Sequence, residues 1–211
     1  MKKYLKNIKD KEFLIPMLYM LGGQFITYMI LKHFQYNYHV FNNYIDNKIP
    51  FIPQVIILYN LFYPMIFIVF YNIYRKDKET FNKGIIAGII GFVIADIIFL
   101  LYPVEIIRPD ISDLNIDHIN KYIIYLTYKY DSPAINCFPS LHCIFCFNAI
   151  YTLYKSNNYK LSNKIIYIII LLMIATTTLL VKQHYIYDVI CAFIVTIISI
   201  LLSNVIYKYK K

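Results

Sequence analysis

Long apolar segments recur along the whole chain and restrict the folds that it can adopt. A helix needs about 20 predominantly apolar residues to cross the hydrocarbon core of a bilayer. Six segments approach or reach that length: 13–33, 52–74, 84–102, 140–154, 164–181 and 183–207. The fourth is short unless it begins earlier, near Ser132 and Pro133. The sequence therefore predicts an all-α, polytopic membrane protein with six transmembrane helices.

The composition agrees with this class of protein. Hydrophobic residues make up 59% of the 211 residues and charged residues only 16%, whereas a soluble domain carries about 25% charged residues. No internal repeat and no Gly- or Ser-rich linker divides the chain. We therefore expect residues 1–211 to form a single integral membrane domain, of unknown oligomeric state.

The net charge of +9 is distributed unevenly among the loops. With six spans, the side of the membrane that holds both termini carries 15 of the 21 Lys and Arg residues, and the opposite side carries six. Because cytoplasmic loops are enriched in Lys and Arg, this distribution predicts that both termini are cytoplasmic. The positive charge is thus explained by membrane topology, and it does not indicate a nucleic-acid partner.

The four Cys residues do not indicate a metal site. Cys143 and Cys146 form a C-x-x-C pair, but the pair lies within an apolar segment and no second pair follows it. We interpret them as small buried apolar side chains.

Three short polar groups lie at the edges of the apolar segments. The first is Arg108 with Pro109, the second runs from Pro139 to His142, and the third comprises Lys182, Gln183 and His184, with Asp188 four residues on. With six spans, all three emerge on the same, non-cytoplasmic side of the membrane. Together they offer a nucleophile, a carboxylate, a second imidazole and two cations, which is a complete set for phosphoryl transfer.

The pair His184 and Asp188 has the spacing of one helical face. A carboxylate that accepts from one ring nitrogen fixes the tautomer and leaves the lone pair of the other nitrogen free to attack. Taken alone, such a pair is common and need not be catalytic. Its position at the edge of a membrane span favours a functional role, because ionisable groups there are costly.

The second imidazole, His142, follows Pro139 and Ser140. Proline near a first helical position and a Ser hydroxyl beside it are typical of a helix N-terminus, and free N–H groups at such a terminus bind anions. An ordinary helix cap would explain Pro139 and Ser140, but it would leave His142 unexplained.

Arg108 and Lys182 could be interfacial anchors that only extend to the membrane surface. Arg108, however, lies near the start of the polar connection 103–138, and His142 follows its end. Connections longer than about 12–15 residues are usually either functional or disordered. Because all three polar groups are expected on the same side of the membrane, we favour a single site that they share.

The order Arg-Pro, Pro-Ser-x-His and His-x-x-x-Asp resembles the motifs of the type 2 phosphatidic acid phosphatase (PAP2) superfamily. The resemblance runs from about the third span to the sixth, and Ile49-Pro50-Phe51 extends it toward the second. It implies a six-helix membrane core and phosphohistidine chemistry that needs no metal and no cofactor.

Carried over by position, the resemblance implies that His184 attacks phosphorus, that Asp188 orients it, and that His142 protonates the leaving oxygen and later activates the acceptor. It implies that the developing negative charge is stabilised by four further positions. These are Arg108, Ser140, the backbone at Leu141 and Lys182.

The chain departs from the family pattern at three positions. The usual Lys seven residues before the Arg is Leu101, the usual Arg six residues before the nucleophilic His is Thr178, and the usual Gly of Pro-Ser-Gly-His is Leu141. Lys182 could replace a lost cation. The motifs Pro-Ser-Leu-His and Lys-Gln-His look like a side branch that includes inositol phosphorylceramide synthase-like phosphotransferases.

The resemblance thus predicts a membrane phosphatase that acts on lipid phosphates, with its active site on the extracytoplasmic face. One alternative is a lipid phosphotransferase that uses an alcohol acceptor, and another is a non-catalytic protein that binds or moves phosphorylated lipids. Asp96, inside the third span, could pair with Lys182, line a headgroup cavity or bond to a neighbouring helix.

Overall fold

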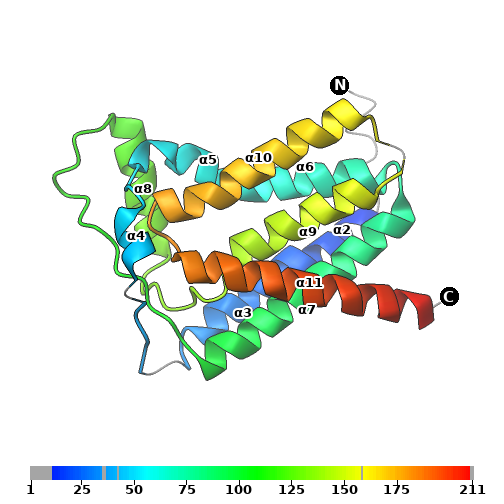
Figure 1. Ribbon diagram of the computed structural model, residues 1–211, viewed down its shortest axis with the longest axis horizontal. Helices are drawn as coiled ribbons and strands as arrows, with labels where there is room; N and C mark the ends of the chain where they lie inside the picture. The colour runs from blue at the N-terminus through cyan, green and yellow to red at the C-terminus, as the bar shows by residue number, and fades with distance from the viewer. Residues whose placement is uncertain (1–10, 35–36, 42, 158, 210–211) are drawn as a thin grey trace.

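The computed structural model describes residues 11–34, 37–41, 43–157 and 159–209, and the regular elements of these residues are helices (Figure 1). The predicted all-α class is confirmed. In chain order the elements are α2 (Lys11–Met17), η1 (Leu18–Gly22), α3 (Gly23–Leu31), α4 (Tyr44–Lys48), η2 (Pro53–Val55), α5 (Ile56–Asn60), α6 (Phe62–Tyr74), α7 (Lys78–Leu101), α8 (His118–Tyr130), α9 (Leu141–Lys155), α10 (Leu161–Leu180) and α11 (Ile186–Tyr209).

Five helical units are long and apolar enough to cross a membrane, which indicates an integral multi-pass membrane protein. They are Lys11–Leu31, Pro53–Tyr74, Lys78–Leu101, Leu161–Leu180 and Ile186–Tyr209. The remaining predicted span, 140–154, forms α9, which has 15 residues. A helix of that length extends only about 22 Å, less than the roughly 30 Å of a hydrocarbon core. The prediction of six spans is therefore not confirmed.

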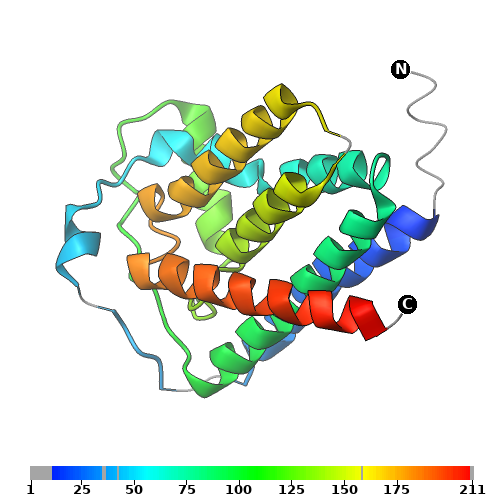
Figure 2. The ribbon, with the colours of Figure 1, turned by 45° about the vertical axis from the view of Figure 1, so that its right-hand side comes forward.

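The short α9 packs against four other helices, α6, α7, α10 and α11 (Figure 2). Its side chains Cys143, Ile144, Phe145 and Cys146 are all buried, in agreement with the interpretation of the two cysteines as apolar core residues. Because α7, α10, α11 and the helical unit that contains α6 are all longer than α9 and surround it, the length of α9 does not need to match the thickness of a bilayer.

Glycines let α7 approach its neighbours closely. A Cβ atom on Gly88 would lie 2.3 Å from Sδ of Met20 in η1, and one on Gly91 would lie 2.8 Å from Cγ2 of Ile144 in α9. A larger residue at either position would therefore force the side chain of Met20 or of Ile144 to shift.

The connection 103–138 contains α8, a helix that the sequence analysis does not predict. Asp117 caps it, because its side chain accepts a hydrogen bond from the N–H of Asn120 (3.0 Å). Ile124 is buried, whereas Tyr122 and Tyr125 are exposed. The helix packs against α5 and η2 and lies at the end of the bundle that is remote from the C-terminus (Figures 1 and 2).

A short extended segment carries the chain from α7 to Arg108. Val104 forms isolated β-bridges with His39 and Asn136, and the N–H of Ile106 donates to the carbonyl of Ala134 (3.0 Å). These bonds fix the approach to Arg108 against the segment that leads into α9.

Candidate active site

His184 lies in the turn between α10 and α11, and its ring orientation is set by two acceptors. Its Nδ1 lies 3.1 Å from Oδ2 of Asp188 and 3.0 Å from the carbonyl oxygen of Cys137. Because both neighbours can only accept, Nδ1 carries the hydrogen and Nε2 keeps the lone pair. This is the tautomer that a nucleophile requires.

Asp188, in the first turn of α11, is fully buried. Its Oδ2 also accepts a hydrogen bond from the N–H of Tyr185 (2.8 Å). The N-terminus of a helix favours a negative charge, so both the helix and this bond hold the carboxylate that orients His184.

Within the turn that presents His184, one carbonyl group accepts two hydrogen bonds. The oxygen of Thr178 accepts from the N–H groups of Gln183 (2.9 Å) and His184 (3.2 Å). Lys182 adopts the left-handed backbone conformation, with φ of 51°, which is uncommon for a residue other than glycine. The chain thereby reverses direction within a few residues and enters α11.

His142 lies in the first turn of α9, behind a helix cap. Oγ of Ser140 accepts from the N–H of Cys143 (3.3 Å), and the N–H of Ser140 donates to the carbonyl of Asp188 (3.2 Å). The cap thus ties the start of α9 to the start of α11. The N–H groups of Leu141 and His142 have no partner within the helix, as is usual in a first turn.

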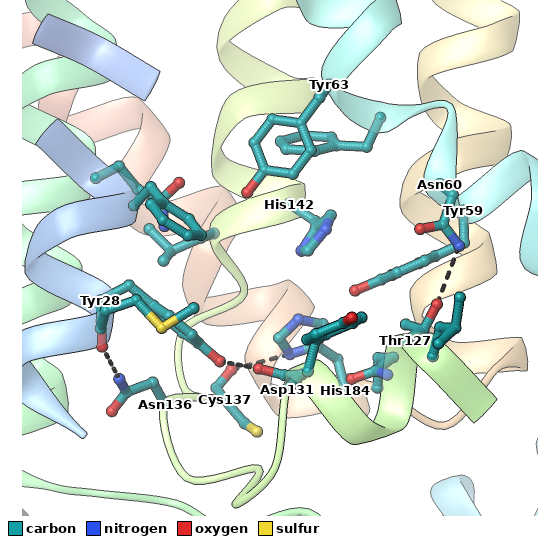
Figure 3. A pocket seen from close by; sticks show the side chains of 18 of the residues that line it. Tyr28, Tyr59, Asn60, Tyr63, Thr127, Asp131, Asn136, Cys137, His142 and His184 are labelled. Atoms are coloured by element: carbon teal, nitrogen blue, oxygen red, sulfur yellow. Dashed lines mark hydrogen bonds between the residues drawn. The ribbon is translucent and has the colours of Figure 1, made fainter. Parts of the chain in front are cut away.

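The two imidazoles lie close together at the wall of one cavity. Their ring centroids are 6.1 Å apart, and the His142 ring packs against Phe62 (4.4 Å) and Tyr59 (4.8 Å) (Figure 3). The cavity has a volume of about 400 Å³ and lies among α3, α5, α6, α8 and the start of α9. Most of its lining side chains are aromatic or aliphatic, including Phe25, Leu126 and Tyr130.

Arg108 reaches the residue next to His184. Its Nη2 donates to Oε1 of Gln183 and to Oδ2 of Asp131, and its Nη1 donates to the carbonyls of Tyr128 (3.1 Å) and Asp131 (3.3 Å). The guanidinium also lies over the Tyr128 ring, 4.7 Å from its centroid. Its remaining donor, Nε, is buried and has no partner among the described residues.

Lys182 contacts α4 and the residue that follows it. Its Nζ donates to the carbonyls of Asp46 (3.0 Å) and Ile49 (2.6 Å), and burial lowers the pKa of its ammonium group. The side chain lines a second cavity, of about 590 Å³, which Arg108 and His184 also line. Lys182 and His142 therefore lie in different cavities, with His184 at both.

Two residues of the site lack an assigned role in the sequence analysis. Asp131, which lines the first cavity, accepts hydrogen bonds from Arg108, from the Tyr28 hydroxyl and from Lys32 Nζ (3.2 Å). Gln183 lines the same cavity and is 2% exposed. Each stands in a segment that the sequence marks as polar, but nothing in the sequence indicates which partners they meet.

Asp96 does not belong to the site. It lies in α7 and lines neither of the two cavities described above, and its Oδ1 is buried without a hydrogen-bond partner among the described residues. In the described part of the chain, no group of three or more His, Cys, Asp and Glu side chains is arranged to hold a metal ion.

Comparison with known protein families gives a match over more than half of the chain. Residues 85–211 match the sequence profile of the PAP2 superfamily, which covers more than half of the chain and includes every residue assigned above to catalysis or phosphate binding. Searches of curated proteins and of solved structures found no match. The chain belongs to the PAP2 superfamily.

Proposed function

We propose that the protein is a membrane phosphatase that hydrolyses lipid phosphates through a phosphohistidine at His184. The arrangement around His184 carries the proposal. Two acceptors hold the hydrogen on Nδ1, and His142 stands at the same cavity, 6.1 Å away between ring centroids. Membership of the PAP2 superfamily supports this type of activity.

In the first step, Nε2 of His184 attacks phosphorus and the bond from phosphorus to the lipid oxygen breaks. His142, which takes up a proton when the anionic phosphate enters the cavity, gives this proton to the departing oxygen. An alcohol leaves from a phosphomonoester and a lipid monophosphate from a diphosphate, while Asp188 stabilises the cationic ring of His184. In the second step, His142 takes a proton from water, and the resulting hydroxide equivalent displaces His184 to release phosphate.

Negative charge on the phosphoryl oxygens needs donors that are already in place. Arg108, Ser140, the N–H of Leu141 and Lys182 are assigned to this role. The first-turn N–H groups of α9 suit it, because a helix N-terminus attracts anions. Lys182 has two of its three N–H bonds committed to carbonyls of the α4 segment, so it has one donor left for phosphate.

A lipid substrate is supported by the cavity that holds both histidines. Phe25 of α3 and Tyr63 of α6 line it, and their side chains are about half exposed on the apolar surface of the bundle. An acyl or prenyl chain could leave between these helices while its phosphate stays at His184. Candidates are a polyprenyl diphosphate, phosphatidylglycerophosphate and phosphatidic acid, presented on the extracytoplasmic face that the Lys and Arg distribution favours.

The direct test uses purified protein and a panel of lipid phosphates in the presence of EDTA. We expect phosphate release from at least one lipid by the wild type and none above background by His184→Ala. Turnover that survives in His184→Ala would rule out the phosphohistidine mechanism.

A second candidate, a lipid phosphotransferase, is favoured by the burial of the nucleophile. His184 is 8% exposed, and its cavity is lined mainly by apolar and aromatic side chains, which limits the access of water. The Pro-Ser-Leu-His motif of the inositol phosphorylceramide synthase-like branch is consistent with this. Product analysis with an added alcohol or lipid acceptor distinguishes transfer from hydrolysis, because transfer yields a new phosphoester and hydrolysis yields free phosphate.

A further inference from the structure

Gln183 is the buried polar side chain immediately before the proposed nucleophile. It is 2% exposed and lines the cavity that also holds His142 and His184. Its backbone N–H is bonded to the carbonyl of Thr178 (2.9 Å), so the turn that positions His184 positions Gln183 as well. Its side chain therefore has a fixed origin at the edge of the reaction cavity.

The orientation of the Gln183 amide follows from its neighbour. An Arg guanidinium carries only donors, so the atom that faces Nη2 of Arg108 must be the amide oxygen, Oε1. The Nε2 group, with its two hydrogens, is then directed away from Arg108. It is buried and has no partner among the described residues.

A buried donor without a partner costs free energy unless something accepts from it. Nε of Arg108 is likewise a buried donor that has no partner among the described residues. Both unpartnered groups are donors, and their side chains are joined by a hydrogen bond. Gln183 lines the cavity of His142, Arg108 lines that of Lys182, and His184 lines both cavities. Such a pair is suited to an anion with several acceptor oxygens.

The cation that the family pattern leads one to expect near this position is missing. Thr178 stands there, and its hydroxyl donates to the carbonyl of Ala175 (2.7 Å) within α10. It therefore does not extend toward the cavity. A neutral donor next to the nucleophile could take over part of the lost contact.

Resting on the proposed function, we propose that Gln183 is a phosphate-binding residue. Its Nε2 donates to a non-bridging oxygen of the phosphoryl group under attack, while its Oε1 orients Arg108 toward a second oxygen. The ligand class is a tetrahedral or trigonal-bipyramidal oxyanion, which includes the phosphate of a lipid headgroup.

Two substitutions separate donation to phosphate from support of Arg108. Gln183→Glu keeps an acceptor for Arg108 but replaces the donor with a negative oxygen. Gln183→Leu removes both functions. For each variant we would measure the Kd for orthovanadate in EDTA, by titration of the detergent-solubilised protein, and the kcat and KM for the best lipid phosphate.

We expect both variants to bind vanadate about ten- to a hundredfold more weakly than the wild type, as for the loss of one charge-assisted hydrogen bond. The matched control is Gln54→Glu, which makes the same change at an exposed Gln of η2 that lines neither cavity. Vanadate affinity should fall less than threefold in that variant, and the thermal unfolding of all variants shows which are folded.

Retention of wild-type vanadate affinity by Gln183→Glu, with loss only in Gln183→Leu, would overturn the proposal, because the residue would then serve only to hold Arg108. Retention by both variants, or absence of vanadate binding by the wild type, would also overturn it. If the wild type binds vanadate through Gln183 but hydrolyses no lipid phosphate, the proposed hydrolysis fails while the assignment of Gln183 stands.

Discussion

The two histidines of the site are held in different ways. Nδ1 of His184 faces a carboxylate and a backbone carbonyl, so its tautomer is fixed. The His142 ring packs against Phe62 and Tyr59, and within the described residues it has no hydrogen-bond partner. A fixed tautomer suits a nucleophile, whereas a ring with two free nitrogens can take up and release protons. The hydrogen bonds of His184 thus suit its proposed role as nucleophile, and the unbonded ring of His142 suits its proposed role in proton transfer.

Removal of the nucleophile should have the largest effect. We expect His184→Ala to lower kcat by about four orders of magnitude or more, because no other group can form the covalent intermediate. Phosphate release from a lipid substrate measures this change, and vanadate binding shows whether the site is still formed. Loss of less than a hundredfold would remove His184 from its role.

Removal of the charge that supports His184 should have the next largest effect. We expect Asp188→Asn to lower kcat by about a thousandfold, somewhat less than the roughly ten-thousandfold found for the carboxylate of a catalytic triad. The carbonyl of Cys137 still accepts from Nδ1 in this variant, so some orientation remains. A fall of less than tenfold would show that Asp188 is only structural.

Removal of the second imidazole should depend on the leaving group. We expect His142→Ala to lower kcat for an alkyl phosphate by about a hundredfold or more. With p-nitrophenyl phosphate, whose leaving group departs without a proton, the first step should continue and give a burst of nitrophenol. Equal losses with both substrates, and no burst, would contradict the division of roles.

The smallest effect is expected at Lys182. Lys182→Met leaves the carbonyls of Asp46 and Ile49 without their donor, so we expect a loss of about 1.5–3 kcal/mol in stability and a change in kcat of less than about tenfold. Lys48→Met, in the exposed part of α4, is the matched control and should have little effect on the melting temperature. A loss of kcat far above tenfold, without loss of stability, would show that Lys182 contributes more to phosphate binding than its one remaining donor can supply.

The membrane helices could be predicted from the sequence because length and apolar composition set them directly. The expected spans 52–74 and 164–181 correspond to Pro53–Tyr74 and Leu161–Leu180. α8 is not predicted, because its 13 residues include Lys121 and Lys129 and are too few and too polar for the apolar spans by which the other helices are found. The shortness of α9 is tolerated because other helices surround it, which is a tertiary effect.

The candidate site likewise has parts that could be predicted from the sequence and parts that could not. The spacing of His184 and Asp188 predicts that their side chains meet, and they do, although His184 stands in the turn before α11 and only Asp188 lies in the helix. The contacts of Arg108 with Asp131 and Gln183 join segments that are far apart in the chain, and no local pattern encodes them. Lys182 shows the same limit, because its role depends on α4, which the sequence does not indicate.

The most direct test of the phosphohistidine proposal is to trap the intermediate in His142→Ala. This variant would be mixed with p-nitrophenyl [³²P]phosphate, quenched in alkali and digested, and the labelled peptide identified by mass spectrometry. An alkali-stable, acid-labile phosphoryl group on His184, which accumulates because His142 no longer activates water, is the predicted result. A burst of nitrophenol with no label on the protein, or a label on any other residue, would contradict it.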